Sequence, residues 1–392
     1  MADNRFDFLE IGDGVEAVVT PHSIPVMPEA QNRERQNKQT DWTAYNPTNE
    51  RTTIPNAYED IVLRSQTQDT SIASVLDSTF RAGDTGLRVV EVIGEPGNRA
   101  GQFNYPTGIA VDTTGVLFVA DSYNHRIQRV TPAADVAVIG SRGSGRGQFL
   151  SPMGVATDPQ KAFYVVEQGN HRVQKFSANG LPQLLFGKMG TRVGEFRGPS
   201  AIAISPVTGH IYIADTGNAR VQRFDVDGSY ISSLGVLGTT SQPLTSPTGV
   251  MVDAHDHVYV TDLKTNRVVK FDPGGRMVGS FIAVRPREGS LSVRALSEPR
   301  AIAMDAEGTL YIADGNSSSN GVNSAGRVQL VDPVTGVDIA NLEEVGHRLG
   351  KLSRPGGLAL TKAPVSQLGM VTHSDLFVSD TANHRVLRFA WK

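Results

Sequence analysis

One phrase, written six times along the chain, constrains the fold more than any other feature of the sequence. Residues 121–130 read DSYNHRIQRV, and related phrases begin at residues 167, 215, 262 and 380. A sixth copy is split, because YIAD ends at Asp314 and GRVQLVD resumes at Gly326 after a segment rich in Ser, Asn and Gly. A catalytic site is rarely copied six times in one chain, whereas a structural unit is. The phrase therefore predicts a repeat architecture.

Each repeat has four parts, and each part has the pattern of a β-strand. A proline precedes an alternating apolar stretch such as TGIAVD, and an aromatic and β-branched run such as LFVAD follows it. The phrase comes next, and then a short apolar run that ends near glycine. Period-2 alternation between turn residues predicts strands. The repeat prolines stand 46, 47, 48, 52 and 56 residues apart, so each repeat predicts one four-stranded propeller blade.

Small residues alternate in the first predicted strand of the repeats, as at Gly108 and Ala110. Met251, beside Gly249, is the exception. Strands nearest the axis of a propeller crowd one another, so small side chains are expected there.

An acidic residue at the end of the second strand recurs with an arginine at the start of the third. We interpret these as structural pairs that join neighbouring strands; a binding surface is the alternative. A buried pair of this kind specifies register more than it adds stability. The pairs are Asp121 with Arg126, Glu167 with Arg172, Asp215 with Arg220, Asp262 with Arg267, Asp314 with Arg327, and Asp380 with Arg385.

The stretch GQFNYPTGIAVDTTGVLFVADSYNHRIQRV resembles an NHL repeat, and all six copies over residues 86–392 resemble that family. The resemblance implies an all-β fold, a six-bladed β-propeller with four-stranded antiparallel blades. The chain reaches RFAWK directly after the third strand of the sixth repeat, whereas GLRVVEVIGEPG before the first repeat has the pattern of a fourth strand. We therefore expect an N-terminal strand at residues 88–93 to complete the last blade, since an unpaired edge would invite aggregation.

Composition excludes several classes of site. The chain of 392 residues has no cysteine, which excludes disulfides, thiol catalysis and cysteine metal sites. It shows no apolar run near 18 residues and no secretory signal at its start, so we expect neither a membrane partner nor secretion. The expected location is the cytoplasm or an assembled particle, of which a virion is one example.

Histidines are the natural candidates for a metal or catalytic site. His125, His171 and His384 belong to the phrase, one per blade, and are predicted to be dispensable. His255 and His257 alternate in a turn, but no third ligand stands near them in sequence. A lyase branch with the same fold places zinc-binding histidines directly after the first-strand prolines. Those positions here are Thr107, Met153, Ser200, Thr248, Arg300 and Gly356.

No catalytic, cofactor-binding or metal-binding residue is therefore predicted, and the chain is predicted not to be an enzyme. Several animal NHL propellers bind RNA on a basic face, which would need a continuous row of cations. No aromatic residues are interleaved for base stacking, so nucleic acid is not favoured as a partner. The blander interpretation places the recurring cations at solvated blade edges. They are Arg129, Lys175, Arg223, Lys270 and Arg388.

Residues 1–85 do not repeat and form a predicted extended N-terminal arm, with a short helix near residues 71–80. The arm holds 14 acidic and 7 basic residues, a balance of −7, whereas the rest holds 26 and 30, a balance of +4. The arm is polar and interrupted by proline, so it is not expected to fold alone. Its predicted anchors are Trp42, Tyr45, Ile54, Tyr58 and Ile61.

From these patterns the first functional hypothesis is a non-enzymatic scaffold for protein–protein interaction. Its arm would anchor the propeller to protein partners or to neighbouring subunits of a larger assembly, without a cofactor. Two alternatives stay open: an RNA- or ligand-binding NHL module, and a lyase or hydrolase acting at the mouth of the propeller channel.

Overall fold

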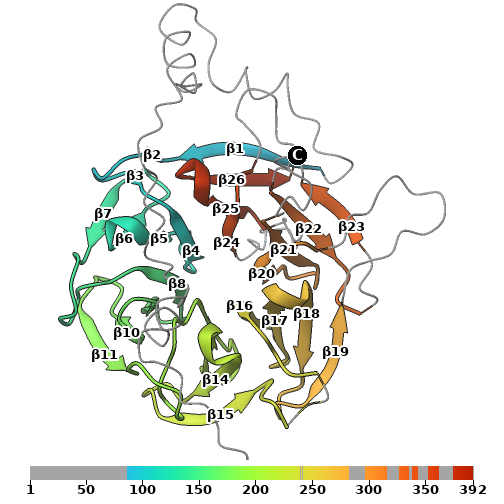
Figure 1. The fold of residues 1–392 in the computed structure, drawn as a ribbon. Helices are drawn as coiled ribbons and strands as arrows, with labels where there is room; N and C mark the ends of the chain where they lie inside the picture. The colour runs from blue at the N-terminus through green and yellow to red at the C-terminus, as the bar shows by residue number, and fades with distance from the viewer. Residues whose placement is uncertain are drawn as a thin grey trace, which may run out of the picture. The chain divides into compact units, whose positions relative to one another are not determined.

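A computed structural model describes residues 86–238, 240, 242–281, 296–315, 326–334, 338–342, 352–361 and 374–391. These residues form six four-stranded sheets arranged as blades around a ring (Figure 1). The expected six-bladed β-propeller is confirmed. The boundary of the arm, the helix near residues 71–80 and the anchors from Trp42 to Ile61 lie outside the described residues and stay predictions.

The strands follow the four parts of the repeat from the axis outward. The first strands are β4 (Pro106–Val111), β8 (Pro152–Thr157), β12 (Ala201–Ile204), β16 (Pro247–Val252), β20 (Pro299–Met304) and β24 (Pro355–Leu360). The second strands are β5 (Leu117–Asp121), β9 (Phe163–Glu167), β13 (Ile211–Asp215), β17 (Val258–Asp262), β21 (Leu310–Asp314) and β25 (Leu376–Asp380).

The third and fourth strands complete each blade on its outer side. The third strands are β6 (Arg126–Val130), β10 (Arg172–Phe176), β14 (Arg220–Phe224), β18 (Arg267–Phe271), β22 (Arg327–Val331) and β26 (Arg385–Trp391). The fourth strands are β7 (Val136–Ile139), β11 (Pro182–Phe186), β15 (Tyr230–Leu234), β19 (Met277–Phe281), β23 (Asp338–Leu342) and β1 (Leu87–Ile93). A short parallel pair, β2 (Glu95–Pro96) with β3 (Gln102–Phe103), lies between β1 and the first blade in sequence.

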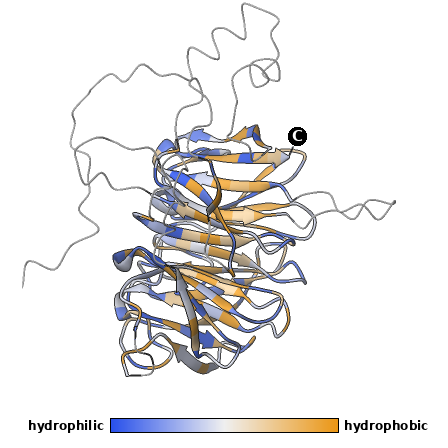
Figure 2. Cartoon of the chain, turned by 90° about the vertical axis from the view of Figure 1, so that its right-hand side faces the viewer, coloured by the Kyte–Doolittle hydropathy of each residue, from blue (hydrophilic) through white to orange (hydrophobic). Residues whose placement is uncertain are grey.

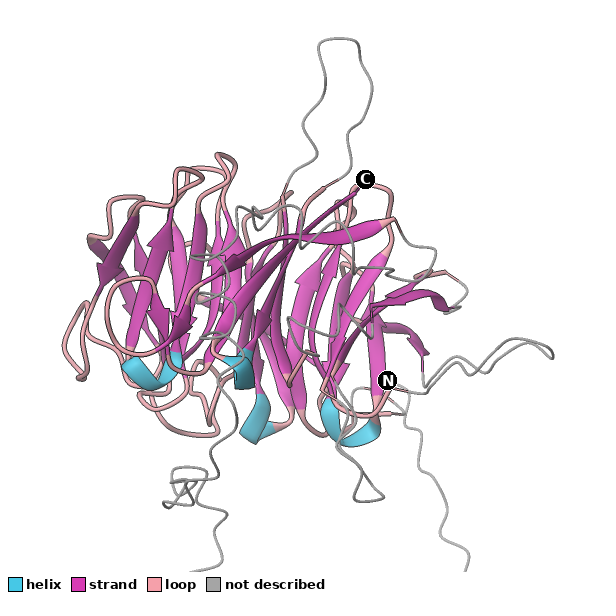
Figure 3. Cartoon of the chain, turned by 90° about the horizontal axis from the view of Figure 1, so that it is seen from above, coloured by secondary structure: helices cyan, strands magenta, loops and turns pink. Residues whose placement is uncertain are grey.

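Short 3-10 helices join the second and third strands in four blades, and Figure 3 shows them together on one side of the ring. The first strands begin on the same side, so we call it the proline face. Among the described residues, no helix is long and apolar enough to cross a membrane. The 3-10 helices are η1 (Ser122–Asn124), η2 (Thr216–Asn218), η3 (Leu263–Thr265) and η4 (Thr381–Asn383).

The ring closes through a strand from the N-terminal side of the repeats. β1 pairs antiparallel with β26, from Leu87 opposite Trp391 to Ile93 opposite Val386 (Figure 1). The sixth blade therefore has the order β1-β26-β25-β24, and the expected closing strand is confirmed. A bulge between Val89 and Glu91 interrupts the register on this outer edge. Such bulges discourage edge-to-edge pairing with other molecules.

Small residues in the first strands allow neighbouring blades to approach backbone to backbone. A Cβ atom added to Gly108 would lie 2.4 Å from the carbonyl oxygen of Met153 in the next blade. A Cβ atom added to Gly357 would lie 2.3 Å from the carbonyl oxygen of Thr107 across the closing junction. Real Cβ atoms do not come so close, so these positions require glycine.

The hydrophobic core lies between the blades rather than at one centre. Phe118 of the first blade stacks on Phe163 of the second at 4.7 Å between ring centroids, and Phe163 stacks on Phe176 at 4.9 Å. All three are buried, and Phe149 packs in the same cluster. Figure 2 shows hydrophobic residues concentrated along the strands. Each blade is thus stabilised by burying apolar surface against its neighbours.

Candidate functional site

The repeated phrase builds one buried polar network in each blade. The acidic residue at the end of the second strand faces the first arginine of the third strand. The separations are 2.7 Å for Asp121–Arg126, 2.6 Å for Glu167–Arg172, and 2.9 Å each for Asp215–Arg220, Asp314–Arg327 and Asp380–Arg385. Asp262–Arg267 is longer, at 3.5 Å. All six carboxylates are fully buried.

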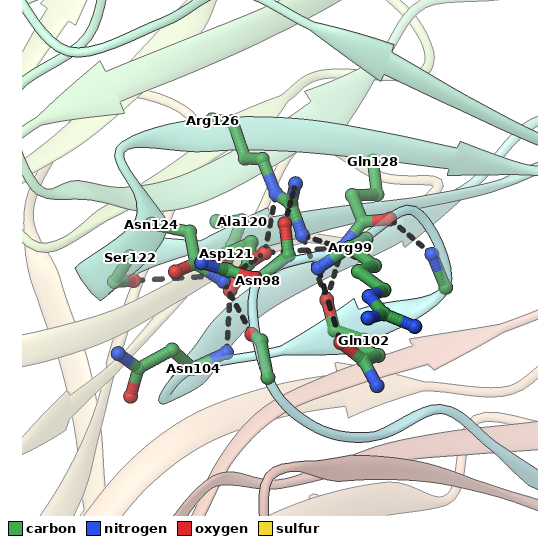
Figure 4. Close-up of polar contacts among 12 residues, drawn as sticks. Asn98, Arg99, Gln102, Asn104, Ala120, Asp121, Ser122, Asn124, Arg126 and Gln128 are labelled. Carbon is green, nitrogen blue, oxygen red and sulfur yellow. Dashed lines mark hydrogen bonds and ion pairs between the residues drawn. The ribbon is translucent and has the colours of Figure 1, made fainter.

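The first blade shows how this network is satisfied (Figure 4). Arg126 donates from Nη1 to the carbonyl oxygen of Asn98 at 2.7 Å and from Nη2 to that of Arg99 at 2.6 Å. Asp121 accepts from the backbone N–H of Asn104 and from the side chain of Asn124. The pair therefore fixes the loop that leads into its own blade. Because its hydrogen bonds are used internally, the pair has a structural task.

Three histidines of the phrase each connect their own blade to the next one. The backbone N–H groups of Ser151, Gly198 and Tyr105 each donate to a histidine Nδ1, at 3.1, 2.9 and 3.1 Å respectively. Burial is the main cause that lowers the pKa of each histidine, which favours the neutral ring that can accept. The acceptors are His125, His171 and His384, all with left-handed backbone conformation.

Hydroxyl groups on the proline face form a second set of inter-blade links. Thr107 donates from Oγ1 to the carbonyl oxygen of Met153 at 3.0 Å, and Ser200 donates from Oγ to that of Thr248 at 3.0 Å. Thr248 in turn donates to the carbonyl oxygen of Pro299 at 2.8 Å. These hydroxyls stand directly after the first-strand prolines, and they serve the scaffold here.

Four of the five recurring cations lie against aromatic rings on the neighbouring second strand. Lys175 lies over Tyr164 at 4.8 Å and Lys270 over Tyr259 at 5.0 Å, measured to the ring centroids. Arg223 and Arg388 make the corresponding contacts with Tyr212 and Phe377, at 5.7 and 5.9 Å. Arg388 also pairs with Asp375 at 2.7 Å. The interpretation as solvated blade edges is therefore too simple, because these side chains are half-buried and already have partners.

The alternating histidines of the fourth blade do not form a metal site. His257 Nδ1 lies 3.1 Å from Asp253 Oδ2, and the rings of His255 and His257 are 6.3 Å apart. In the part of the chain that the structure describes, no group of three or more His, Asp or Glu residues is arranged to hold a metal ion.

The fifth blade departs from the repeat at both residues that flank its proline. Arg300 Nη2 lies 2.7 Å from Glu298 Oε2, and each side chain is 26% exposed. The Nε atom of Arg300 is buried and has no hydrogen-bond partner among the described residues. A charged pair with an unused donor therefore stands at the inner end of this blade, where the first blade has Thr107.

A glycine makes room for this pair. Gly315 follows Asp314, at the position that holds Ser122 in the first blade and Thr216 in the third. A Cβ atom at Gly315 would lie 2.9 Å from Arg300 Nε and 3.1 Å from Glu298 Oε2. The backbone N–H of Glu298 donates to Asp314 Oδ1 at 2.6 Å, which holds the pair to the buried network of its own blade.

A second departure stands on the first blade of the same face. Tyr105 precedes Pro106 and stacks on Tyr123 of η1, with 4.6 Å between ring centroids and 22° between planes. Tyr105 also meets His384 edge-on at 5.0 Å. Tyr123 is 46% exposed, so the stacked pair presents a ring to solvent.

These residues were not predicted as a site. Arg300 entered the prediction only as a position without a zinc-binding histidine, and Glu298, Tyr105 and Tyr123 were not singled out. The available signal was the departure from the repeat at equivalent positions. Motifs shared by all repeats do not reveal a departure in a single blade, so the sequence predicts no catalytic residue.

Comparison with known proteins adds two family matches. The NHL-repeat model matches residues 103–130, and the model of the SMP-30/gluconolactonase/LRE-like region matches residues 154–287. The chain is a six-bladed β-propeller whose first repeat matches the NHL-repeat model. The expected resemblance is thus confirmed. A search of curated proteins finds no match in sequence.

Solved structures with the same fold include proteins of several activities. A protein of unknown function from Bacteroides thetaiotaomicron is 16% identical, with a TM-score of 0.56, covering 78% of this chain and 75% of that one. A gluconolactonase of Xanthomonas campestris is 15% identical, with a TM-score of 0.50, covering 82% and 94%. A streptogramin B lyase is 12% identical, with a TM-score of 0.51, covering 78% and 98%. At these identities the likeness shows the fold.

The prediction that this propeller is not an enzyme is wrong. The match to the SMP-30/gluconolactonase/LRE-like region spans the second to fourth blades and contradicts it. The comparisons also give no support to a scaffold or virion role. The physical reason for the error is that the residues shared by all repeats serve the scaffold, whereas Glu298 and Arg300 depart from the repeat in a single blade.

Proposed function

We propose that this propeller is a hydrolase that cleaves carboxylic ester bonds, with lactones as its substrate class. The reaction takes place at the channel mouth on the proline face, with Glu298 and Arg300 as the catalytic residues. The observation that carries the proposal is the Glu298–Arg300 pair, with a buried Arg300 Nε that lacks a partner. The match to the SMP-30/gluconolactonase/LRE-like region supports this enzyme class.

Each group has a task that fits its chemistry. Arg300 presents a guanidinium to the carbonyl oxygen of the substrate and stabilises the oxyanion that forms in the transition state. Glu298 takes a proton from water as general base, and the water oxygen bonds to the carbonyl carbon. The carbon–oxygen ester bond then breaks, and Glu298 returns the proton to the leaving alkoxide. A lactone becomes one hydroxy acid by addition of one water molecule.

Water is the nucleophile because the nearby hydroxyl groups are already used as donors. Thr107, Ser200 and Thr248 each donate to a backbone carbonyl of the next blade. A hydroxyl held in this way lacks a free base to remove its proton. The Glu298 carboxylate is the partly exposed acid next to the cation; Glu298 directly precedes β20, and Arg300 is the second residue of that strand.

The test is hydrolysis of δ-valerolactone and D-glucono-δ-lactone, followed by acid release at constant pH. Glu298→Gln keeps the size of the side chain and removes the base, so kcat should fall by about 10²–10⁴. Arg300→Ala should lower kcat/KM by about 10²–10³. Glu307→Gln is the matched control, since Glu307 is exposed on the turn between β20 and β21 and lies away from the pair.

Isotope labelling separates hydrolysis from elimination. Hydrolysis in H₂¹⁸O should place one labelled oxygen in the product acid. Substrate loss without label would assign lyase chemistry to the same pair and overturn the hydrolase proposal. Equal rates for the wild type and Glu298→Gln would remove Glu298 from the mechanism. Binding of residues 1–85 to neighbouring protein subunits is a separate proposal, on which the described residues do not bear.

A further inference from the structure

We propose that Tyr105 and Tyr123 form a subsite for an aromatic ring of the substrate, so that aromatic lactones are preferred over aliphatic ones. This inference rests on the proposed function and deepens it. The two rings are stacked at 4.6 Å and 22°, and Tyr123 is 46% exposed. An exposed tyrosine that is itself stacked on a second ring is a platform for a further flat ring.

The fold does not need these two aromatic side chains. The positions that correspond to Tyr123 in other blades hold Gly169, Gly217, Lys264 and Ala382. The positions that correspond to Tyr105 in the second, third and fourth blades hold Ser151, Gly198 and Ser246. All of these residues occupy equivalent positions of the repeat in other blades, so blade geometry does not require a large ring there.

The backbone at Tyr105 has an unusual conformation for a large residue. Its φ angle is 54°, in the left-handed region where the third blade uses glycine at Gly198. A bulky residue in this region is energetically unfavourable. Ser151 and Arg354 hold the equivalent positions of the second and sixth blades with φ angles of 48° and 54°, so the conformation belongs to the repeat, and it is the stacked ring that distinguishes Tyr105.

The platform is held in place before any ligand arrives. The backbone N–H of Tyr105 donates to His384 Nδ1 at 3.1 Å, and the His384 ring meets Tyr105 edge-on at 5.0 Å. The backbone N–H of Tyr123 donates to the carbonyl oxygen of Asn104 at 3.1 Å. A preorganised ring loses little conformational freedom on binding, which favours affinity.

The platform and the catalytic pair stand in one sector of the proline face. β20 of the fifth blade lies beside β24 of the sixth, and β24 lies beside β4 of the first. The intervening sixth blade has Gly356, without a side chain, directly after its proline, and the exposed Arg354 directly before it. A substrate with its ester carbonyl at Arg300 would therefore extend an attached ring across the sixth blade towards Tyr123.

Dihydrocoumarin and δ-valerolactone separate ring recognition from catalysis. Both are six-membered lactones, and only the first carries a fused benzene ring. Tyr123→Ala should raise KM for dihydrocoumarin by about three- to tenfold, the usual worth of an aromatic pair, and leave KM for δ-valerolactone unchanged. Tyr123→Phe should keep both values. Lys264→Ala, at the same turn position of the fourth blade, is the matched control.

A second measurement keeps this inference independent of the reaction. Chroman has the same two rings without the carbonyl group, and its binding can be followed by saturation-transfer NMR. Chroman binding should survive in Glu298→Gln and disappear in Tyr123→Ala. Equal chroman binding by the wild type and Tyr123→Ala would overturn the subsite, even if both lactones are hydrolysed.

Failure of the proposed function gives a different pattern. Chroman binding that depends on Tyr123, without hydrolysis of any lactone, would keep the ring site and reject the reaction. Displacement of chroman by an oligoribonucleotide but not by dihydrocoumarin would assign the platform to a nucleobase and overturn its role as a substrate subsite.

Discussion

The proline face has two unlike halves. In the second, third and fourth blades, the residues on either side of the proline are uncharged: Ser151 and Met153, Gly198 and Ser200, and Ser246 and Thr248. In the fifth, sixth and first blades, charged and aromatic residues enter the same positions. They are Glu298 and Arg300, Arg354 with Gly356, and Tyr105 with Thr107.

The difference between the two halves separates residues that the repeat fold requires from residues that are candidates for the function of this protein. The uncharged half links blade to blade with hydroxyl and histidine hydrogen bonds that close on backbone carbonyls and N–H groups. The fifth blade has the Glu298–Arg300 ion pair in place of the hydroxyl link, whereas the first and sixth blades keep their hydroxyl and histidine links. Packing between blades requires the same residues at the same positions of every repeat. Positions that depart from the repeat are therefore the best candidates for catalytic or binding residues.

Breaking the regular network should have the largest effect on folding. Arg172→Met leaves the fully buried Glu167 carboxylate without its cation and should lower the free energy of unfolding by about 3–5 kcal/mol. Arg276→Met is the control, since Arg276 pairs with Asp272 at the surface with its side chain 82% exposed, and should change stability by at most about 1 kcal/mol. Urea unfolding measures both. A stable Arg172→Met variant would mean that the network is dispensable.

Making the irregular sector regular should remove activity without harming the fold. Arg300→Thr with Gly315→Ser rebuilds the hydroxyl pair of the first blade, where Thr107 Oγ1 and Ser122 Oγ are 2.6 Å apart. Ester hydrolysis should fall by about 10²–10³. Each restored inter-blade hydrogen bond should add about 0.5–1.5 kcal/mol to the free energy of unfolding.

The single variant sharpens this test. Gly315→Ser alone places a Cβ atom 2.9 Å from Arg300 Nε and should destabilise the fold, whereas the double variant should not. Urea midpoints and lactone hydrolysis, measured on the same preparations, separate the two effects. A double variant that is less stable than the wild type would show that Arg300 serves the scaffold.

The fold could be predicted from sequence because its information is repeated. Six copies of the strand pattern fix the period, and the closing role of residues 88–93 follows from one missing strand. The candidate site could not be found in this way. Tyr105 and Tyr123 are separated by a full strand pair, and Glu298 lies in a different repeat. Closure of the propeller places the fifth and first blades on either side of the sixth. No local sequence pattern predicts this neighbourhood.

The smallest expected effect concerns the histidine links of the regular network. His171 accepts from the backbone N–H of Gly198 at 2.9 Å, whereas the next blade has Ala219 at the same position and lacks this bond. His171→Ala should therefore lower the free energy of unfolding by only about 0.5–1.5 kcal/mol at pH 8. This small loss agrees with the expectation that the repeat histidines are individually dispensable for folding.

The loss should shrink in acid, because burial lowers the pKa of His171 in the folded chain below its ordinary value of 6.5. Above that value the ring is neutral in both states, and the bond contributes fully. As the pH falls below it, the unfolded chain binds the proton first, so the stability of the wild type decreases through this group. His171→Ala has no such titration, and the two unfolding curves should approach each other at pH 5. His255→Ala, which changes an exposed histidine on the turn before β17, is the matched control. If the difference in unfolding free energy between the wild type and His171→Ala stays constant or increases in acid, the His171 ring does not act as a neutral acceptor.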